Sequence, residues 1–153
     1  MRVLITGATG LVGSNIAKKC IANGIEVNYL TTSKDKIENK PNYKGFYWDP
    51  SKKEIDDNCL NDVDAIIHLA GASIAKRWTS SYKEEIIDSR VETAKLLYNS
   101  LKSSNRHISQ FISASAVGIY PSSLQKLYTE DDSKIDDSFL AEVVEKWEAA
   151  ADS

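Results

Sequence analysis

The stretch TGATGLVG, residues 6–13, constrains the fold of this chain more than any other. Its glycines follow an apolar run, RVLIT, and precede a helical pattern. Gly7 permits a tight turn, Gly10 lets the backbone approach a pyrophosphate, and Gly13 lets a helix pack closely on the strand. The helix N-terminus would then offer free N–H groups to phosphates. Between a first strand and a first helix, this spacing predicts a dinucleotide-binding turn.

Strand-like and helical segments alternate along the rest of the chain. Several apolar runs are continuous, which is typical of parallel strands covered on both faces. Such alternation predicts an α/β fold with right-handed crossovers, that is, a Rossmann-type doubly wound parallel sheet. We expect its strands at residues 2–6, 26–30, 45–48, 65–70 and 110–117.

Three helices are predicted between and after these strands. The first ends at Gly24, and the last covers about residues 138–151. A long polar connection, residues 120–137, should lie over the ligand-binding edge of the sheet, because such edges form beyond the strand C-termini. The first helix places Ile16, Cys20 and Ile21 on one side, and the second carries a stripe of Ile87, Val91, Ala94, Tyr98 and Leu101.

Composition and charge exclude several functional classes. A length of 153 residues suits one domain, and a net charge of -3 shows no basic face for nucleic acid. No apolar run reaches the length of a membrane span. Cys20 and Cys59 lack metal or disulfide spacing, and His68 and His107 are isolated. We therefore expect a cytoplasmic protein without a metal, and no nucleic-acid or membrane partner.

Several motifs together resemble the extended short-chain dehydrogenase/reductases, the family of the NAD-dependent epimerases and dehydratases. TGATGLVG is similar to that family's TGxxGxxG, and DAIIHLAG and FISASAVGIY resemble its fourth and fifth strands. WDP, HLAGASIAKRW, DSRVETA, SASAVG and FLAEVVEKWEAAA resemble an atypical, epimerase-like subgroup whose reaction is not established. Members of that subgroup are about twice as long. The resemblance therefore implies that residues 1–153 form the NAD(P)-binding domain, with the last strands and a substrate-binding domain outside this chain.

The resemblance also implies which residues contact the cofactor. Asp49 would face the adenine amino group, although it could equally be a turn residue before Pro50. Ser115 lies in the register of the catalytic serine. The other implied cofactor contacts are Gly7, Ala8, Thr9, Gly10, Leu11, Val12, Gly13, Leu69, Ala70, Gly71 and Ser113.

The end of the second strand favours NADP over NAD. An acid at this place would bind the ribose 2′-hydroxyl of NAD and repel a 2′-phosphate. Here the position is Thr31, and Lys34 follows, which would accept a phosphate. Asp35 lies in the same region, but we interpret it as a solvated residue beyond the strand end. The predicted cofactor is therefore NADP, with NAD as the alternative.

The family's proton-transfer pair, a tyrosine and a lysine four residues later, is absent from its expected place. A phenol with a pKa near 10 needs such cationic help near neutral pH. Phe139 and Val143 stand there instead, 24 residues after Ser115 in the case of Phe139. The one tyrosine with a lysine at this spacing, Tyr98 with Lys102, precedes Ser115 and lies on an apolar stripe, so we interpret Tyr98 as a core residue.

Other residues near the same edge are candidate substitutes. Tyr120 could supply a phenol, or could only pack or gate. Arg77 and Arg90 could bind a substrate phosphate or carboxylate, or could pair with Glu84, Glu85 or Asp88. His68 lies within an apolar run and is expected to be a buried structural histidine.

Two functions remain open at this point. The first is an NADP-dependent reductase or epimerase-like enzyme with a divergent site, acting on an unknown small molecule with Ser115 orienting its oxygen. The second is a nucleotide-binding sensor or interaction module without turnover. The replacement by Phe139 and Val143 favours this second function unless Tyr120, or the domain expected outside this chain, supplies the acid. A homodimer is a further assembly that the sequence leaves open.

Overall fold

A single sheet organises the chain, and five of its strands are parallel. The computed structural model describes residues 1–152 and orders the strands β3-β4-β2-β1-β6-β7. The short strands β3 and β5 are antiparallel to β4. The parallel strands are β1 (Arg2–Thr6), β2 (Glu26–Thr31), β4 (Tyr43–Asp49), β6 (Ala65–His68) and β7 (Gln110–Ser113), and the short ones are β3 (Asn39–Lys40) and β5 (Glu54–Ile55).

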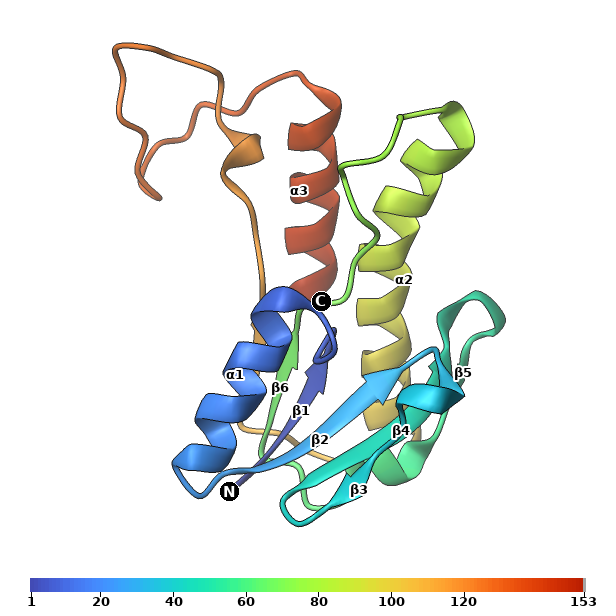
Figure 1. The fold of residues 1–153 in the computed structure, drawn as a ribbon. Helices are drawn as coiled ribbons and strands as arrows, with labels where there is room; N and C mark the ends of the chain where they lie inside the picture. The colour runs from blue at the N-terminus through green and yellow to red at the C-terminus, as the bar shows by residue number, and fades with distance from the viewer. Residues whose placement is uncertain (153) are drawn as a thin grey trace.

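Three helices cover this sheet, as Figure 1 shows: α1 (Leu11–Ala22) lies on one face, and α2 (Ser80–Ser103) lies on the other. The third helix, α3 (Phe139–Ala151), stands beside α2 and follows the long connection 120–137. The fold class predicted from the sequence, a Rossmann-type doubly wound sheet, is therefore confirmed. None of the helices in residues 1–152 combines the length and apolar character needed to cross a membrane.

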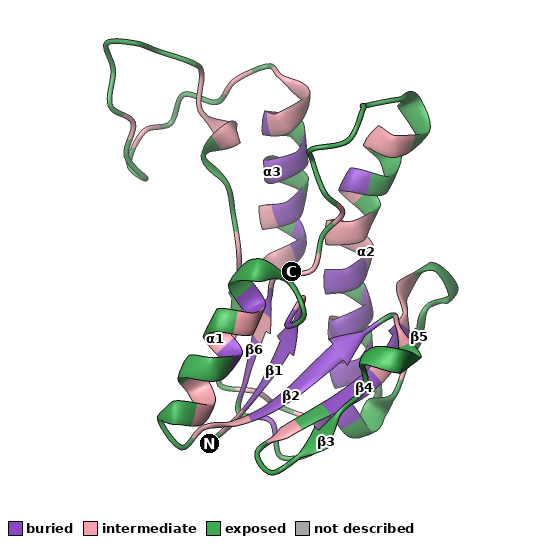
Figure 2. Cartoon of the chain, in the orientation of Figure 1, coloured by how far each residue is buried: buried purple, intermediate pink, exposed green. Residues whose placement is uncertain are grey.

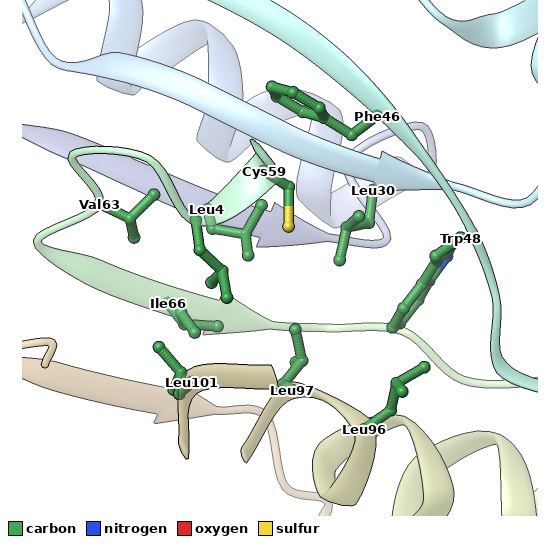
Figure 3. Packing of buried hydrophobic residues seen from close by; sticks show 11 residues of the cluster. Leu4, Leu30, Phe46, Trp48, Cys59, Val63, Ile66, Leu96, Leu97 and Leu101 are labelled. Carbon is green, nitrogen blue, oxygen red and sulfur yellow. The ribbon is translucent and has the colours of Figure 1, made fainter. Parts of the chain in front are cut away.

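Alternate residues of the strands supply two separate cores. Val3, Ile5 and Val27 pack against the α1 side, whereas Leu4 and Ile66 pack against α2. Figure 3 shows the second cluster, in which leucines of α2 meet side chains of β1, β2, β4 and β6. Buried residues accordingly concentrate in the central strands and the inward sides of the helices (Figure 2). Both faces of β1 and β2 are covered, which explains their continuous apolar runs.

Two strands end earlier than the sequence suggested. We expected strands over residues 65–70 and 110–117, but β6 stops at His68 and β7 at Ser113. Beyond His68, the N–H groups of Leu69 and Ala70 bond to the side-chain hydroxyl of Thr6 instead of a backbone carbonyl of β1. Once β6 has ended, the only further backbone bond on that side of β7 among residues 1–152 runs from Ala114 N to His68 O.

The apolar stripe of α2 is rotated from its predicted position. Ala94 and Leu101 are buried as expected, but Ile87, Val91 and Tyr98 are only half-buried. The fully packed positions include Ile86, Thr93, Leu96 and Leu97. Because α2 contacts both the sheet and α3, its buried surface is wider than one stripe.

Candidate functional site

The turn between β1 and α1 has the geometry that a phosphate site requires. Gly7 has φ of 71°, a left-handed conformation that favours glycine, and its main chain lies against Leu69 and Ala70. A Cβ at Gly13 would lie only 2.3 Å from the carbonyl oxygen of Gly7, so α1 can approach the turn only because Gly13 lacks one. Gly10 is the N-cap of α1 and provides no side-chain cap, which leaves N–H groups of the first turn open to an anion.

One buried hydroxyl holds this turn against the end of β6. Thr6 Oγ1 accepts N–H bonds from Leu69 and Ala70, both 3.0 Å, and therefore donates its own proton to His68 Nδ1 at 2.8 Å. The proton of His68 is then on Nε2, which faces Thr93 Oγ1 at 3.2 Å. His68 is fully buried, as predicted, and burial lowers its pKa to about 4. It is a neutral structural residue rather than a catalytic base.

A cleft of about 950 Å³ opens beside the glycine turn, at the C-terminal ends of the parallel strands. This is the edge at which open α/β sheets bind ligands. One wall comes from the β1 turn and the segment 70–72, another from the ends of β2 and β4, and a third from α2. Of the implied cofactor contacts, Gly7, Thr9, Thr31, Asp49, Ala70 and Gly71 line the cleft.

The remaining implied contacts of the turn lie differently. Ala8 is buried, whereas Leu11 and Val12 are exposed at the first turn of α1, being 84% and 60% accessible. Leu69 is half-buried and contributes its N–H to Thr6. Ser113 ends β7, and its hydroxyl bonds to the carbonyl of Ala114.

At the end of β2, the structure separates the residues that the sequence grouped together. Thr31 is buried, and its hydroxyl forms a local turn with the backbone of Ser33. The Lys34 ammonium lies 5.0 Å over the ring of Tyr47 and does not line the cleft. Asp35 is exposed and also outside the cleft lining.

Asp49 combines a turn role with a place in the cleft. Its Oδ1 accepts bonds from Ser51 N and Ser51 Oγ, at 3.2 and 2.6 Å, and Oδ2 pairs with Lys52 at 3.3 Å. The hydrogen bond from Ser51, together with Lys52, holds the pKa of Asp49 below its usual value. The carboxylate is therefore ionised and anchored, and can accept a further N–H such as that of an adenine amino group.

Ser115 and Tyr120 both line a second hollow, of about 540 Å³, beyond the end of β7. The hydroxyl of Ser115 donates to the carboxylate of Glu148 on α3. Tyr120 stacks on Tyr128, with ring centroids 5.3 Å apart. The connection 120–137 extends away from the sheet beside α3 and lines this hollow rather than the glycine cleft, through residues such as Glu130 (Figure 1).

Phe139 and Val143 are packing residues on α3. The Phe139 ring meets Trp78 edge-on at 5.4 Å, and the Lys83 ammonium lies 4.7 Å over it. Val143 is buried. Tyr98 is also a packing residue, as predicted: it stacks on Phe111 at 4.8 Å and donates its hydroxyl proton to the carbonyl of Ala151.

The two candidate arginines have different surroundings. Arg90 donates to the carbonyls of Ile86 and Ala72, at 2.8 and 3.3 Å, and lies 5.0 Å over the Trp147 ring. Its burial lowers the pKa of the guanidinium. Within residues 1–152 neither Arg90 nor Arg77 forms an ion pair, so the pairing considered with Glu84, Glu85 or Asp88 is not present. Arg77 is exposed.

Several site residues were missed by reasoning from the sequence. Thr6 and Thr93 carry no signal apart from being polar within apolar patterns, and Glu148 lies among other charged residues of its helix. Lys36 and Lys53, which line the cleft, were also missed. Across residues 1–152, no group of three His, Cys, Asp or Glu side chains is arranged to hold a metal ion.

Comparisons with known proteins agree with this geometry. The sequence model of the NAD dependent epimerase/dehydratase family matches residues 3–139. An epimerase family protein of Staphylococcus saprophyticus is 36% identical over 148 residues, which are 97% of this chain and 48% of that protein. The chain thus spans about half the length of the curated relatives it matches.

Solved structures extend the comparison. A human epimerase family protein, crystallised with NADPH, superposes with a TM-score of 0.78 at 29% identity, over 99% of this chain and 48% of that one. A nucleoside-diphosphate sugar epimerase from Corynebacterium glutamicum is 35% identical with a TM-score of 0.75, over 99% of this chain and 30% of that chain.

Proposed function

Because the chain belongs to the NAD dependent epimerase/dehydratase family, we propose that it binds a nicotinamide dinucleotide in the cleft beside the Gly7 turn. The observation that carries this proposal is the turn itself. Gly7 adopts a left-handed conformation, Gly13 allows α1 to touch the turn, and no side chain caps the first turn of that helix. A pyrophosphate fits these features because it needs close backbone approach and free N–H donors.

NADP is the preferred cofactor in this proposal. Within residues 1–152, no carboxylate of the segment directly after β2 lines the cleft, whereas Lys36 of that segment does. NAD-selective sites place an acid there to bind the ribose hydroxyls. The presence of NADPH in the similar human protein supports the same preference. Free cysteines, Cys20 and Cys59, are consistent with a reducing compartment such as the cytoplasm.

We further propose that the matched region supplies the cofactor-binding domain, and that the substrate is selected by parts of the relatives outside the match. A sugar nucleotide is the substrate class suggested by the Corynebacterium glutamicum protein. Arg77 and Arg90 remain our candidates for a substrate phosphate or carboxylate, with Arg90 needing to exchange a backbone carbonyl for it.

For catalysis, the pair Ser115 and Glu148 replaces the missing tyrosine and lysine. The bound nicotinamide would supply or accept a hydride. When a substrate alcohol is oxidised, its hydroxyl proton passes to Ser115 Oγ while the Ser115 proton passes to Glu148, which becomes a neutral acid. The hydrogen bond from Ser115 to Glu148 supports this relay, and Tyr120 lines the same hollow.

Hydride transfer by the full-length protein tests this proposal. Nicotinamide absorbance is followed while sugar nucleotides and small carbonyl compounds are offered with NADPH or NADP. We expect Ser115→Ala and Glu148→Gln to lower turnover about 100-fold or more without weakening NADPH binding, since proton transfer is typically worth that much. Equal turnover in the wild type and both variants would contradict the relay.

A sensor or interaction module without turnover is the second candidate. The packing of Phe139 against Trp78 and the burial of Val143 favour it, because neither place can exchange a proton. In that case, NADPH binds but no substrate of either class is converted by the full-length protein. Such a result would contradict the enzyme hypothesis and still support the proposed cofactor site.

A further inference from the structure

Four lysines lie near the ends of β2 and β4, but two of them are already engaged. The Lys34 ammonium lies over the ring of Tyr47, at 5.0 Å from its centroid. Lys52 pairs with Asp49 at 3.3 Å. The charge of an ammonium held in this way is already partly matched, which reduces the gain from a new contact with a phosphate.

Lys36 and Lys53 are the two lysines that line the cleft. Both are exposed, and within residues 1–152 neither ammonium forms an ion pair or a contact with an aromatic ring. The cleft lining contains no other lysine or arginine among these residues. Two unpaired cations, one after β2 and one in the turn between β4 and β5, therefore line the same cleft.

The backbone that carries each lysine is fixed although its side chain is free. The buried Tyr29 donates its hydroxyl proton to Lys36 O at 2.6 Å and accepts a bond from Glu38 N at 2.8 Å. This ties the segment after β2 to the sheet. Fixed attachment points of this kind reduce the ordering cost of binding an anion.

Lys53 is held by a different device. It has φ of 57°, and its N–H bonds to Pro50 O at 3.1 Å. The turn is closed at its base by two successive pairs of β4 and β5, Asp49 with Glu54 and Trp48 with Ile55. The turn thus presents the Lys53 side chain at the rim of the cleft.

The opposite wall of the cleft has the opposite charge. Glu84, Glu85, Asp88 and Glu92 of α2 all line it. Glu92 is partly neutralised by Lys95 at 2.8 Å, but the other three form no ion pair within residues 1–152. A phosphate monoester is therefore repelled from α2 and attracted to the wall formed by β2 and the β4–β5 turn.

We propose that Lys36 and Lys53 together bind the 2′-phosphate of NADP(H), and that they, rather than Lys34, decide the preference over NAD(H). This inference rests on the proposed function, because it assumes that the dinucleotide occupies this cleft. The hydroxyl groups of Thr32 and Ser33 line the same end and can donate additional bonds. A phosphate with about two negative charges is well matched by two such ammonium groups.

The test measures dissociation constants for NADPH and NADH with the full-length protein, by calorimetric titration at one salt concentration. We expect Lys36→Met and Lys53→Met each to weaken NADPH binding about 10-fold, and the double variant about 100-fold, since each removes one charge-assisted contact. NADH binding should stay within about twofold, because NADH lacks the 2′-phosphate.

Two further variants test whether the loss of NADPH affinity is specific to Lys36 and Lys53. Lys44→Met removes a lysine that lies over the Phe46 ring outside the cleft, and should change neither constant. Lys34→Met tests whether Lys34, the lysine that the sequence favours, binds the 2′-phosphate instead of Lys36 and Lys53. The inference is overturned if the double variant keeps its NADPH affinity, if NADPH and NADH affinities fall together, or if Lys34→Met alone causes the loss. Failure of the wild type to bind either dinucleotide would instead refute the proposed function.

Discussion

At the scale of single residues, the hydroxyl of Thr6 determines how the cofactor edge is built. It accepts bonds from two backbone N–H groups just after β6 and donates its own proton to His68. His68 in turn reaches Thr93 of α2. Because all three side chains are buried, an unpaired group here would be costly, and the network fixes one arrangement of β1, β6 and α2.

The lowered pKa of His68 predicts a loss of stability in mild acid. The unfolded chain protonates this histidine near pH 6.5, whereas the folded chain resists protonation until about pH 4. Between these values the unfolded state binds more protons, so the free energy of unfolding falls as the pH falls. The contribution is fully present above pH 6.5, and on the order of 3 kcal/mol of it is lost by pH 4.

Urea unfolding at several pH values checks this effect. His68→Gln should flatten the decline between pH 6.5 and 4 relative to the wild type, because the titrating group is gone. The exposed His107 provides the matched control, and His107→Gln should leave the slope unchanged. An identical slope in His68→Gln and the wild type would show that His68 is not buried in its neutral form.

Tyr98 gives a second prediction at this scale. Its ring stacks on Phe111 and its hydroxyl bonds to Ala151 O, so Tyr98→Phe should cost about 1 kcal/mol of unfolding free energy and leave NADPH affinity unchanged. Urea unfolding and NADPH titration measure the two effects. A folded Tyr98→Phe variant that lost turnover would instead identify Tyr98 and Lys102 as the proton-transfer pair.

At the scale of elements, the glycine turn and the helix behind it were predictable because their spacing follows from backbone geometry alone. The strand ends were not. Where β6 and β7 stop depends on the Thr6 bonds, which join residues more than sixty positions apart. For the same reason Ser115 could be aligned with a family serine, but its partner Glu148 could not be found from sequence.

The approach of α1 to the turn predicts a sharp response at Gly13. In Gly13→Ala the new Cβ would overlap the Gly7 carbonyl oxygen, so the helix or the turn must move. We expect a loss of about 3 kcal/mol, the upper range for over-packing, and a weaker NADPH affinity. Asn15→Ala, on the exposed side of the same helix, should stay within about 0.5 kcal/mol in the same unfolding assay. Wild-type stability in Gly13→Ala would contradict the close contact.

At the scale of the whole molecule, two walls of the cleft carry opposite charges. Lysines of the β2 and β4–β5 segments face carboxylates of α2 across it. The sequence, with its interspersed charges and net charge of -3, shows no such division. Only the fold brings Lys36 and Lys53, 17 positions apart, to one wall. The polarity of the cleft orients a ligand with phosphate at one end and leaves the reaction to residues near Ser115.

Cofactor binding is the claim on which the rest of this account depends, and a thermal melt of the full-length protein tests it most directly. At a hundred times its dissociation constant, NADPH should add about 2.7 kcal/mol to the stability of the folded protein and raise the melting temperature. At the same concentration NADH should raise it less, and Gly10→Leu should abolish both shifts, because a side chain there blocks the pyrophosphate. Equal melting temperatures with and without NADPH and NADH in the folded wild type would contradict the account.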